Sequence, residues 1–281
     1  MKYAFVCLLL TLTFLVKAEV GEIPHQDLKH IKYLFEELVN SHDFSYTVFG
    51  SKPMSLADFS VEVPPNLPLR RWIRSKYLMY RRRSGLKAWY KHRDKFDLKD
   101  FIFLDEERDW LPCLVLVLIS KKNMLRILHE HESIFAKELG ASFTPESFLA
   151  KLEKRELSMA TATNKSQRLI GIILGYGVRN ATLFQERYDT MKAIWKREKE
   201  NLPEDTALTK KIADIEAQCG DFSELDADAI IHPLYFLADV SHPETIALQK
   251  KYEQERQQII SLRKKHNFMD LVLERLCSHS S

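Results

Sequence analysis

The feature that most constrains the fold is a run of seven consecutive apolar residues, Cys113–Ile119. The run is shorter than the roughly 20 residues that a membrane-spanning helix needs, and its length suits a strand. Because both of its faces are apolar, the strand Leu114–Ser120 is expected at the centre of a sheet that is covered on both sides. Aromatic and β-branched residues predict further short strands at Phe44–Phe49, Phe101–Leu104 and Leu234–Leu237.

Most of the other apolar residues recur at helical spacing. The chain has only 10 prolines and 8 glycines, which favours long helices over a β-sandwich. The predicted fold class is α+β, a predominantly helical single domain over residues 19–281, packed around a small sheet of three or four short strands. We predict helices at Asp27–Asn40, 69–95, Asn123–Leu139, Thr144–Glu156, Lys165–Arg197, Ser241–His266 and Asn267–Cys277, and a short helical turn at Ser55–Asp58.

Several of these helices begin at residues that are typical caps. Asp27, Asn123 and Thr144 each precede a helical pattern, and Gly140 follows one. Ser241 and Glu244 have the spacing of a capping box, in which each side chain satisfies a backbone donor of the other residue.

Residues 1–18 have the pattern of a cleavable signal peptide. Lys2 supplies the positive start, Ala4 to Val16 are apolar, and the small residue Ala18 precedes Glu19. The apolar part is too short for a retained membrane anchor. We therefore expect an exported protein, periplasmic or extracellular, whose mature chain begins near Glu19.

Positive charge is concentrated in residues 69–95. They contain eleven Lys and Arg and a single acid, Asp94, whereas the chain from Glu19 onward has 40 basic and 39 acidic residues. Aromatic residues are interleaved with the basic ones, a combination that suits lipid headgroups, nucleic acid or an acidic protein surface. The candidate contact residues for such an anionic partner are Arg70, Arg71, Arg74, Arg81, Arg82, Arg83, Lys87, Trp89 and Tyr90.

A structural role for this segment competes with the binding role. Six acidic residues follow between Asp97 and Asp109 and would neutralise the basic helix if they packed against it. Arg81, Arg82 and Arg83 distinguish the two interpretations, because three adjacent helical residues fan around roughly 200° and cannot all face one internal partner.

A weaker anion-binding candidate is the turn at Gly50, Ser51 and Lys52. Its backbone N–H groups and its lysine suit an anion, although a plain turn accounts for the same residues more simply.

Glycines and histidines elsewhere in the sequence are weaker candidates for ligand sites. Gly171, Gly175 and Gly177 interrupt an apolar helical stretch, which predicts close helix packing, with a ligand-contacting break at Gly175–Gly177 as the alternative. His129 and His131 point to different sides of a helix and do not suit a shared metal ion. The sequence has no cofactor or metal motif, and we expect neither group.

Four segments also carry a resemblance. They are FSYTVFGSKP (44–53), LISKK (118–122), LGYGVRNATLF (174–184) and HPETIALQKKY (242–252). In order and spacing they resemble an uncharacterised family of exported proteins from Chlamydia-related intracellular bacteria. The resemblance implies a bacterial envelope or secreted protein with a host-facing role, and it assigns no catalytic residue.

Three classes of function follow from these observations. The favoured one is an exported soluble binding or effector-type protein that contacts an anionic partner through residues 69–95. One alternative is an envelope hydrolase with an unrecognised site, which would gather distant titratable residues such as Lys52, Tyr176 and His232 around a pocket. The other is a structural envelope protein without a ligand. The sequence specifies no oligomeric state.

Overall fold

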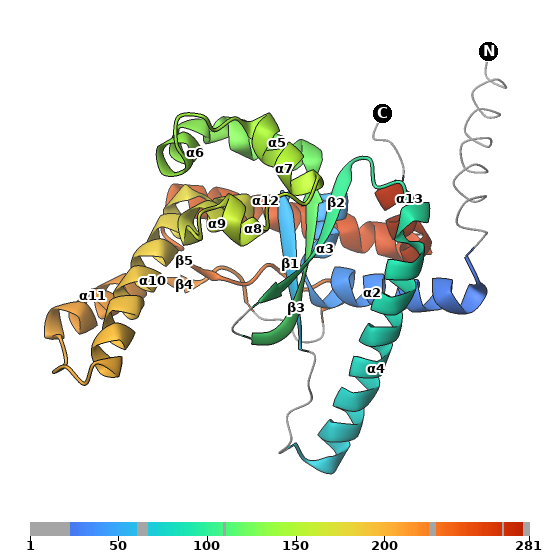
Figure 1. Cartoon of the computed structure of the whole chain (residues 1–281), viewed down its shortest axis with the longest axis horizontal. Helices are drawn as coiled ribbons and strands as arrows, with labels where there is room; N and C mark the ends of the chain where they lie inside the picture. Colours follow the sequence, from blue (N-terminus) through green and yellow to red (C-terminus); the bar gives the residue numbers. More distant parts are fainter. Residues whose placement is uncertain (1–22, 61–66, 109–110, 225–228, 266, 278–281) are drawn as a thin grey trace.

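The computed structural model describes residues 23–60, 67–108, 111–224, 229–265 and 267–277 and confirms the α+β class, with 65% of the chain in helices (Figure 1). The signal-peptide prediction falls on residues 1–18, outside the described part of the chain. None of the helices among the described residues is both long enough and apolar enough to cross a membrane. The elements are α2 (His25–Ser41), α3 (Phe44–Phe49), β1 (Met54–Ser60), α4 (Leu69–His92), a 3-10 turn (Arg93–Lys95), β2 (Phe101–Arg108), β3 (Leu111–Ser120), α5 (Lys121–Glu130), α6 (Glu132–Leu139), α7 (Pro145–Glu153), α8 (Met159–Ala162), α9 (Gln167–Ile173), α10 (Val178–Lys199), α11 (Thr206–Ala217), β4 (Gly220–Asp221), β5 (Leu237–Ala238), α12 (Pro243–Lys265) and α13 (Phe268–Cys277).

Strand β3 is the centre of a three-stranded antiparallel sheet with the order β1-β3-β2. Val117 lies opposite Leu56 on one side and Leu104 on the other. The prediction that this apolar run forms a central strand is confirmed. Strands β4 and β5 form a second, separate sheet of two strands. The expectation of a single sheet is therefore not met.

Alternate residues of β3 belong to two different hydrophobic cores. Leu116 and Leu118 pack with apolar residues of α2, α3, α4, α12 and α13. Val115, Val117 and Ile119 pack with residues of α5, α6, α7 and α9. Figure 1 shows these two groups of helices on different sides of the sheet. Successive side chains of a strand point to opposite faces, so one apolar run supports both layers.

Two short segments have structures opposite to those expected. Phe44–Phe49 is a helix instead of a strand, and Ser55–Asp58 belongs to strand β1 instead of a helical turn. The first five residues of α3 are all buried, so the segment has no polar face and its composition cannot distinguish a helix from a strand. The hydroxyls of Thr47 and Ser55 lie 2.7 Å apart and join α3 to β1.

Most helix limits agree with expectation, and the exceptions concern caps and breaks. Thr144 caps α7 and Gly140 ends α6, as predicted. Ser120, and not Asn123, caps α5, and the expected helix from Asn123 to Leu139 is divided at His131. The expected helix Lys165–Arg197 is divided into α9 and α10, and the strand predicted at Leu234–Leu237 is reduced to β5.

Helix α4 continues without a break through Ser84 and Gly85. A Cβ atom added at Gly85 would lie 2.8 Å from Leu34 Cβ and 3.0 Å from the carbonyl oxygen of His30, both in α2. At Gly85 the two helices are therefore too close to leave room for a side chain. The C-terminal half of α4 packs on α2 there, and its N-terminal end projects from the body of the protein (Figure 1).

This contact predicts that Gly85→Leu is destabilising even though leucine favours helix more than glycine does. We expect the free energy of unfolding to fall by about 1–3 kcal/mol, because the added side chain must push α2 and α4 apart. Urea denaturation followed by circular dichroism measures the change. Ser84→Leu, on the neighbouring half-buried position, is the control and should have a much smaller effect. A Gly85→Leu protein as stable as the original would contradict this account of the helix contact.

Candidate anion-binding surface

Helix α4 carries nine Lys and Arg and no acidic residue between Leu69 and His92. Its C-terminal half is fixed to the body by buried residues on one face, Gly85, Ala88, Trp89 and His92. His92 and Lys91 both hydrogen-bond the carboxylate of Asp27, at 2.8 and 2.9 Å. These bonds lower the pKa of Asp27, the bond from His92 most of all. Asp27 therefore lies inside α2 as a partner of α4 and is not the cap expected at that position.

Trp89 lies in the core and not on the surface. Only 2% of it is exposed, and its ring contacts the rings of Phe35, Phe96 and Phe103 with centroids 5.1–5.2 Å apart. The expectation that Trp89 helps to bind a partner is therefore wrong. Its position on the same helical face as Gly85 and Ala88 explains the burial, since residues three and four apart share one face.

Arg81, Arg82 and Arg83 have three different environments, as their fan around the helix requires. Arg82 is half-buried and donates two hydrogen bonds to Glu37 of α2, from Nε at 2.7 Å and from Nη2 at 2.5 Å. The Arg81 guanidinium lies 4.0 Å from the centre of the Tyr33 ring. Arg83 is exposed. Part of this triplet therefore serves the contact between α4 and α2.

The carboxylates that pair with Arg82 and Lys91 of α4 belong to Glu37 and Asp27 of α2, and the acidic segment 97–109 contributes Asp105 near the helix. Asp105 of that segment pairs with Arg155 at 2.9 Å. It also accepts a hydrogen bond from Tyr90, and burial together with this carboxylate raises the pKa of Tyr90 to about 12. Tyr90 is 38% exposed and Lys87 is exposed beside it.

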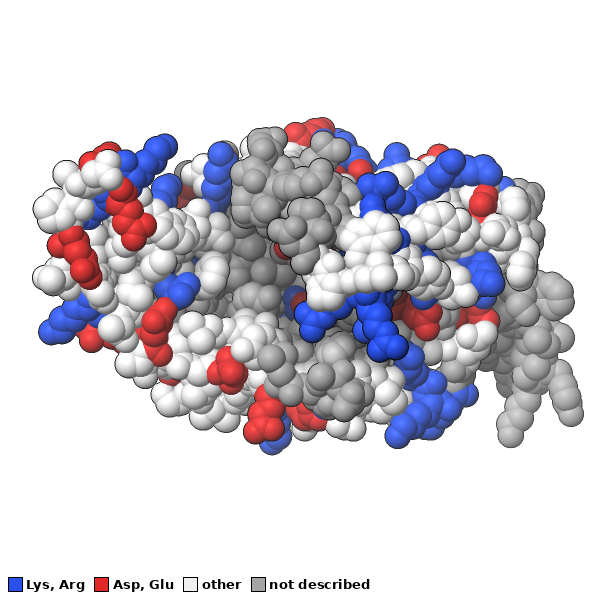
Figure 2. Space-filling model, turned by 90° about the horizontal axis from the view of Figure 1, so that it is seen from below, with Lys and Arg blue, Asp and Glu red and all other residues white. Residues whose placement is uncertain are grey.

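The N-terminal half of α4 differs from the C-terminal half. Arg70, Arg71 and Arg74 are exposed, and none of them forms an ion pair with another residue of the described chain. Figure 2 looks at the face where this part of α4 comes forward, and shows Lys and Arg gathered around uncharged side chains, with few acidic groups among them. Of the predicted contact residues, these three arginines are the ones the structure leaves most available to a partner.

The turn at Gly50, Ser51 and Lys52 binds an anion that belongs to the protein itself. The backbone N–H of Ser51 donates to Glu255 Oε2 at 3.1 Å, and its hydroxyl donates to Glu255 Oε1 at 2.5 Å. Lys52 has no exposed surface, and its Nζ lies 3.0 Å from Asp43 Oδ2 and 2.5 Å from the carbonyl oxygen of Met54. The turn thus connects α3 to α12.

Aromatic residues enclose the Lys52 ammonium. It lies 5.5 Å from the centre of the Tyr176 ring, and Tyr252 and Tyr46 pack nearby with ring centroids 6.0 Å apart. Burial lowers the pKa of Lys52 and raises the pKa of Tyr176, while the Asp43 carboxylate opposes the change at Lys52. The hydroxyl of Tyr46 donates to the backbone oxygen of His232. Of the three residues suggested for an enzyme site, Lys52 and Tyr176 lie in contact. They converge in the interior, where a substrate has no access to Lys52.

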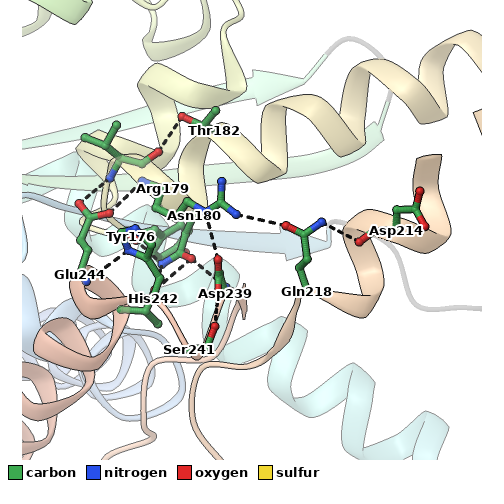
Figure 3. Close-up of polar contacts among 12 residues, drawn as sticks. Tyr176, Arg179, Asn180, Thr182, Asp214, Gln218, Asp239, Ser241, His242 and Glu244 are labelled. Carbon is green, nitrogen blue, oxygen red and sulfur yellow. Dashed lines mark hydrogen bonds and ion pairs between the residues drawn. The ribbon is translucent and has the colours of Figure 1, made fainter.

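The break between α9 and α10 is the centre of a polar network shown in Figure 3. Gly175 and Gly177 both have positive φ, and the carboxylate of Glu244 accepts hydrogen bonds from the backbone N–H groups of Val178 and Arg179, each at 2.9 Å. Glu244 therefore caps α10 and does not form the capping box expected with Ser241. A Cβ atom at Gly177 would lie 2.8 Å from the Glu244 carboxyl carbon, so only glycine fits this approach.

Asn180 satisfies the buried polar groups behind this cap. Its amide donates to the oxygen of Tyr176 and to the Thr245 hydroxyl, and its carbonyl accepts from the backbone N–H of Asp239. Asp239 accepts from Ser241 and Arg179, and these bonds lower its pKa, with the Ser241 bond contributing most. The break at Gly175–Gly177 therefore contacts α12 and the loop before it, and Gly171 packs closely on Ala181 as the glycine spacing predicted.

An open depression of about 540 Å³ lies elsewhere, lined by the six residues from Asp94 to Lys99 together with Lys121 and Glu153. Its lysines and carboxylates are partly paired, as in Lys121–Glu153 and Lys99–Asp97. Within the described residues no group of His, Cys, Asp and Glu side chains is arranged to hold a metal ion. His129 pairs with Glu146, and Cys113, Cys219 and Cys277 form no disulfide with one another.

The ion pair between the buried Lys52 and Asp43 is expected to stabilise the folded protein. Lys52→Met leaves the Asp43 carboxylate without its partner, and we expect a loss of about 2–4 kcal/mol in the free energy of unfolding, because breaking a buried pair costs more than replacing it. The double variant Asp43→Asn with Lys52→Met should recover most of the loss. Urea denaturation of the three proteins is the measurement. If the double variant is no more stable than Lys52→Met, the pair does not contribute as described.

His42, at the end of α2, gives a pH-dependent prediction. Burial lowers its pKa, against the opposite influence of Glu37 and Asp43. The ordinary histidine pKa is about 6.5, so the unfolded chain takes up this proton more readily and stability falls as the pH drops below that value. Unfolding measured at pH 7.5 and pH 5.0 should show a smaller loss for His42→Gln than for the original protein. Equal losses would mean that His42 is not the group responsible.

Comparisons with known proteins found no match for this chain among family models, curated proteins or solved structures.

Proposed function

We propose that the protein is an exported, non-enzymatic binding or effector-type protein that contacts an anionic partner through the N-terminal half of α4. The observation that carries the proposal is the set of three exposed arginines, Arg70, Arg71 and Arg74, on a helix without acidic residues. Guanidinium groups bind carboxylate and phosphate through paired hydrogen bonds, which makes arginine suited to such a partner.

The division of α4 into two halves supports a binding role over a purely structural one. In the C-terminal half, Arg82 and Lys91 are paired with carboxylates of α2. A helix that served only to pack against α2 would need no cationic groups beyond that contact. The arginines at the other end add repulsion to the folded protein, which a bound anion would relieve.

An envelope hydrolase is less well supported. Tyr176 and Tyr46 come from distant parts of the sequence and both contact Lys52, which has no exposed surface. Their hydrogen bonds are made to the protein's own carboxylate and carbonyl groups. A reaction needs a group that reaches its substrate, and this cluster supplies none.

Export remains part of the proposal on the basis of residues 1–18, and the resemblance to exported proteins of Chlamydia-related bacteria stays a prediction. Both would make the partner a component of an envelope or of the surroundings of the cell.

The proposal predicts that Arg70→Ser, Arg71→Ser and Arg74→Ser together weaken binding to a polyanion. On a heparin column at pH 7, this triple variant should elute at clearly lower salt, because each lost cation removes released counterions from the binding equilibrium. The chain without residues 1–18 is used throughout.

A matched control carries Lys192→Ser, Lys196→Ser and Lys199→Ser in α10. These lysines are also exposed, and the variant has the same net charge as the test variant. It should elute nearly as the original does. If the two triple variants elute at the same salt concentration, net charge alone explains retention and the proposed surface is wrong.

A further inference from the structure

The N-terminal half of α4 exposes an apolar stripe as well as arginines. Its members recur at intervals of three, four and seven residues. They therefore lie on one face that covers about 140° of the helix. They are Leu69, Trp72, Ile73, Tyr77 and Tyr80, which are 73%, 39%, 55%, 58% and 64% exposed.

This exposure is unusual for a helix in a soluble domain. The apolar face of a surface helix normally packs on the core, as α2 does with Ile31, Leu34 and Leu38. In α4 the stripe lies on the side of the helix away from the buried Gly85, Trp89 and His92. The five side chains are therefore presented outward on the part of the helix that projects from the body (Figure 1).

The charges around the stripe have one sign. Lys76 lies within it, with its ammonium 5.3 Å from the centre of the Trp72 ring, and Arg70 and Arg74 lie beside it on the helix. An outward apolar stripe with Trp and Tyr, bordered by Lys and Arg, has the composition of a helix that lies in the interface of a membrane. The aromatic rings suit the headgroup level, where one part of the side chain is apolar and the other is hydrated.

We infer that the N-terminal half of α4 binds anionic lipid bilayers, with Leu69, Trp72, Ile73, Tyr77 and Tyr80 inserted at the headgroup boundary and Arg70 and Arg74 on lipid phosphates. The inference rests on the proposed function and names its partner. The helix would lie on the membrane and not cross it.

Charge and side-chain chemistry favour lipid over the other anionic partners. Nucleic acid offers phosphates and stacking surfaces, which suit the arginines and rings, but it has no apolar layer for the aliphatic Leu69 and Ile73. A second copy of the chain seated on this stripe would bring together two helices that each carry nine basic residues and no acid. A bilayer containing acidic lipids matches both the charge and the apolar side chains.

The test uses sedimentation with vesicles of phosphatidylcholine containing about 30% phosphatidylglycerol, because acidic headgroups attract cationic segments. The chain without residues 1–18 is used, so that the apolar leader cannot bind lipid itself. The test variant carries Trp72→Ser, Ile73→Ser and Tyr77→Ser, which removes apolar surface and keeps every charge. We expect its partition onto these vesicles to fall at least about tenfold, since insertion depends on buried apolar area.

The matched control carries Phe184→Ser, Tyr188→Ser and Trp195→Ser. These residues form an exposed aromatic set on α10, with 47%, 36% and 52% exposure, and should not affect binding. Trp72 gives a second measurement, because its fluorescence should shift to shorter wavelength with the acidic vesicles and not with pure phosphatidylcholine. In the Trp72→Phe variant, this shift should be lost while binding is largely kept.

The heparin column separates failure of this inference from failure of the proposed function. The stripe variant should keep the heparin retention of the original, because its cations are intact. If heparin retention depends on Arg70, Arg71 and Arg74 but vesicle binding is absent, or is equal for the stripe and control variants, the membrane inference is overturned and anion binding stands. If the arginines affect neither, both proposals are overturned.

Discussion

The structure depends on the burial of both faces of β3. Its odd-numbered and even-numbered residues enter different cores, so the sheet must be covered on each side. A sheet of three strands is too narrow to provide two cores by itself. Helices from both ends of the chain complete one core, and α5 to α9 from its middle complete the other. The core that contains Leu116 and Leu118 is built by α2, α3 and α4 from the first third of the chain and by α12 and α13 from the last. The first and last helices of the described chain therefore lie in the same layer.

The position of α4 follows from that layer. Trp89 fills the space between Phe35, Phe96 and Phe103, and Gly85 lets the helix approach α2 closely enough for this contact. A helix of 24 residues is about 36 Å long, which exceeds the length that its buried residues occupy. The N-terminal half therefore continues beyond the core. Anchoring at one end and the absence of proline and glycine between Leu69 and Ser84 together place the cationic and apolar side chains of the candidate surface in solvent.

The sequence predicted features that depend on local chemistry or on a clear period. The helix at Asp27–Asn40 was predicted correctly because Ile31, Leu34, Phe35, Leu38 and Val39 repeat at helical spacing and form its one buried face. The same reasoning failed for Phe44–Phe49, which is surrounded on all sides. It also failed for Trp89, because the side of α4 that meets the core is set by α2 and the sheet. Basic content alone did not separate the half of α4 that packs from the half that projects.

The hydrogen-bond partners of several carboxylates could not be predicted from the sequence either. Asp27, Glu244 and Glu255 each precede or follow residues that suggest a local cap or a solvated pair, yet each binds groups 60 or more residues away in the sequence. Glu244 satisfies the orphan N–H groups of α10, and Glu255 satisfies the turn before β1. A free N–H group in the interior costs more than a local cap gains, so tertiary packing decides which acid serves which donor. The carboxylates of Asp27, Glu244 and Glu255 are therefore already bonded to backbone and side-chain donors of the fold. Arg70, Arg71 and Arg74 lie beyond their reach, which is why the positive charge at the end of α4 is matched by no carboxylate within the described chain.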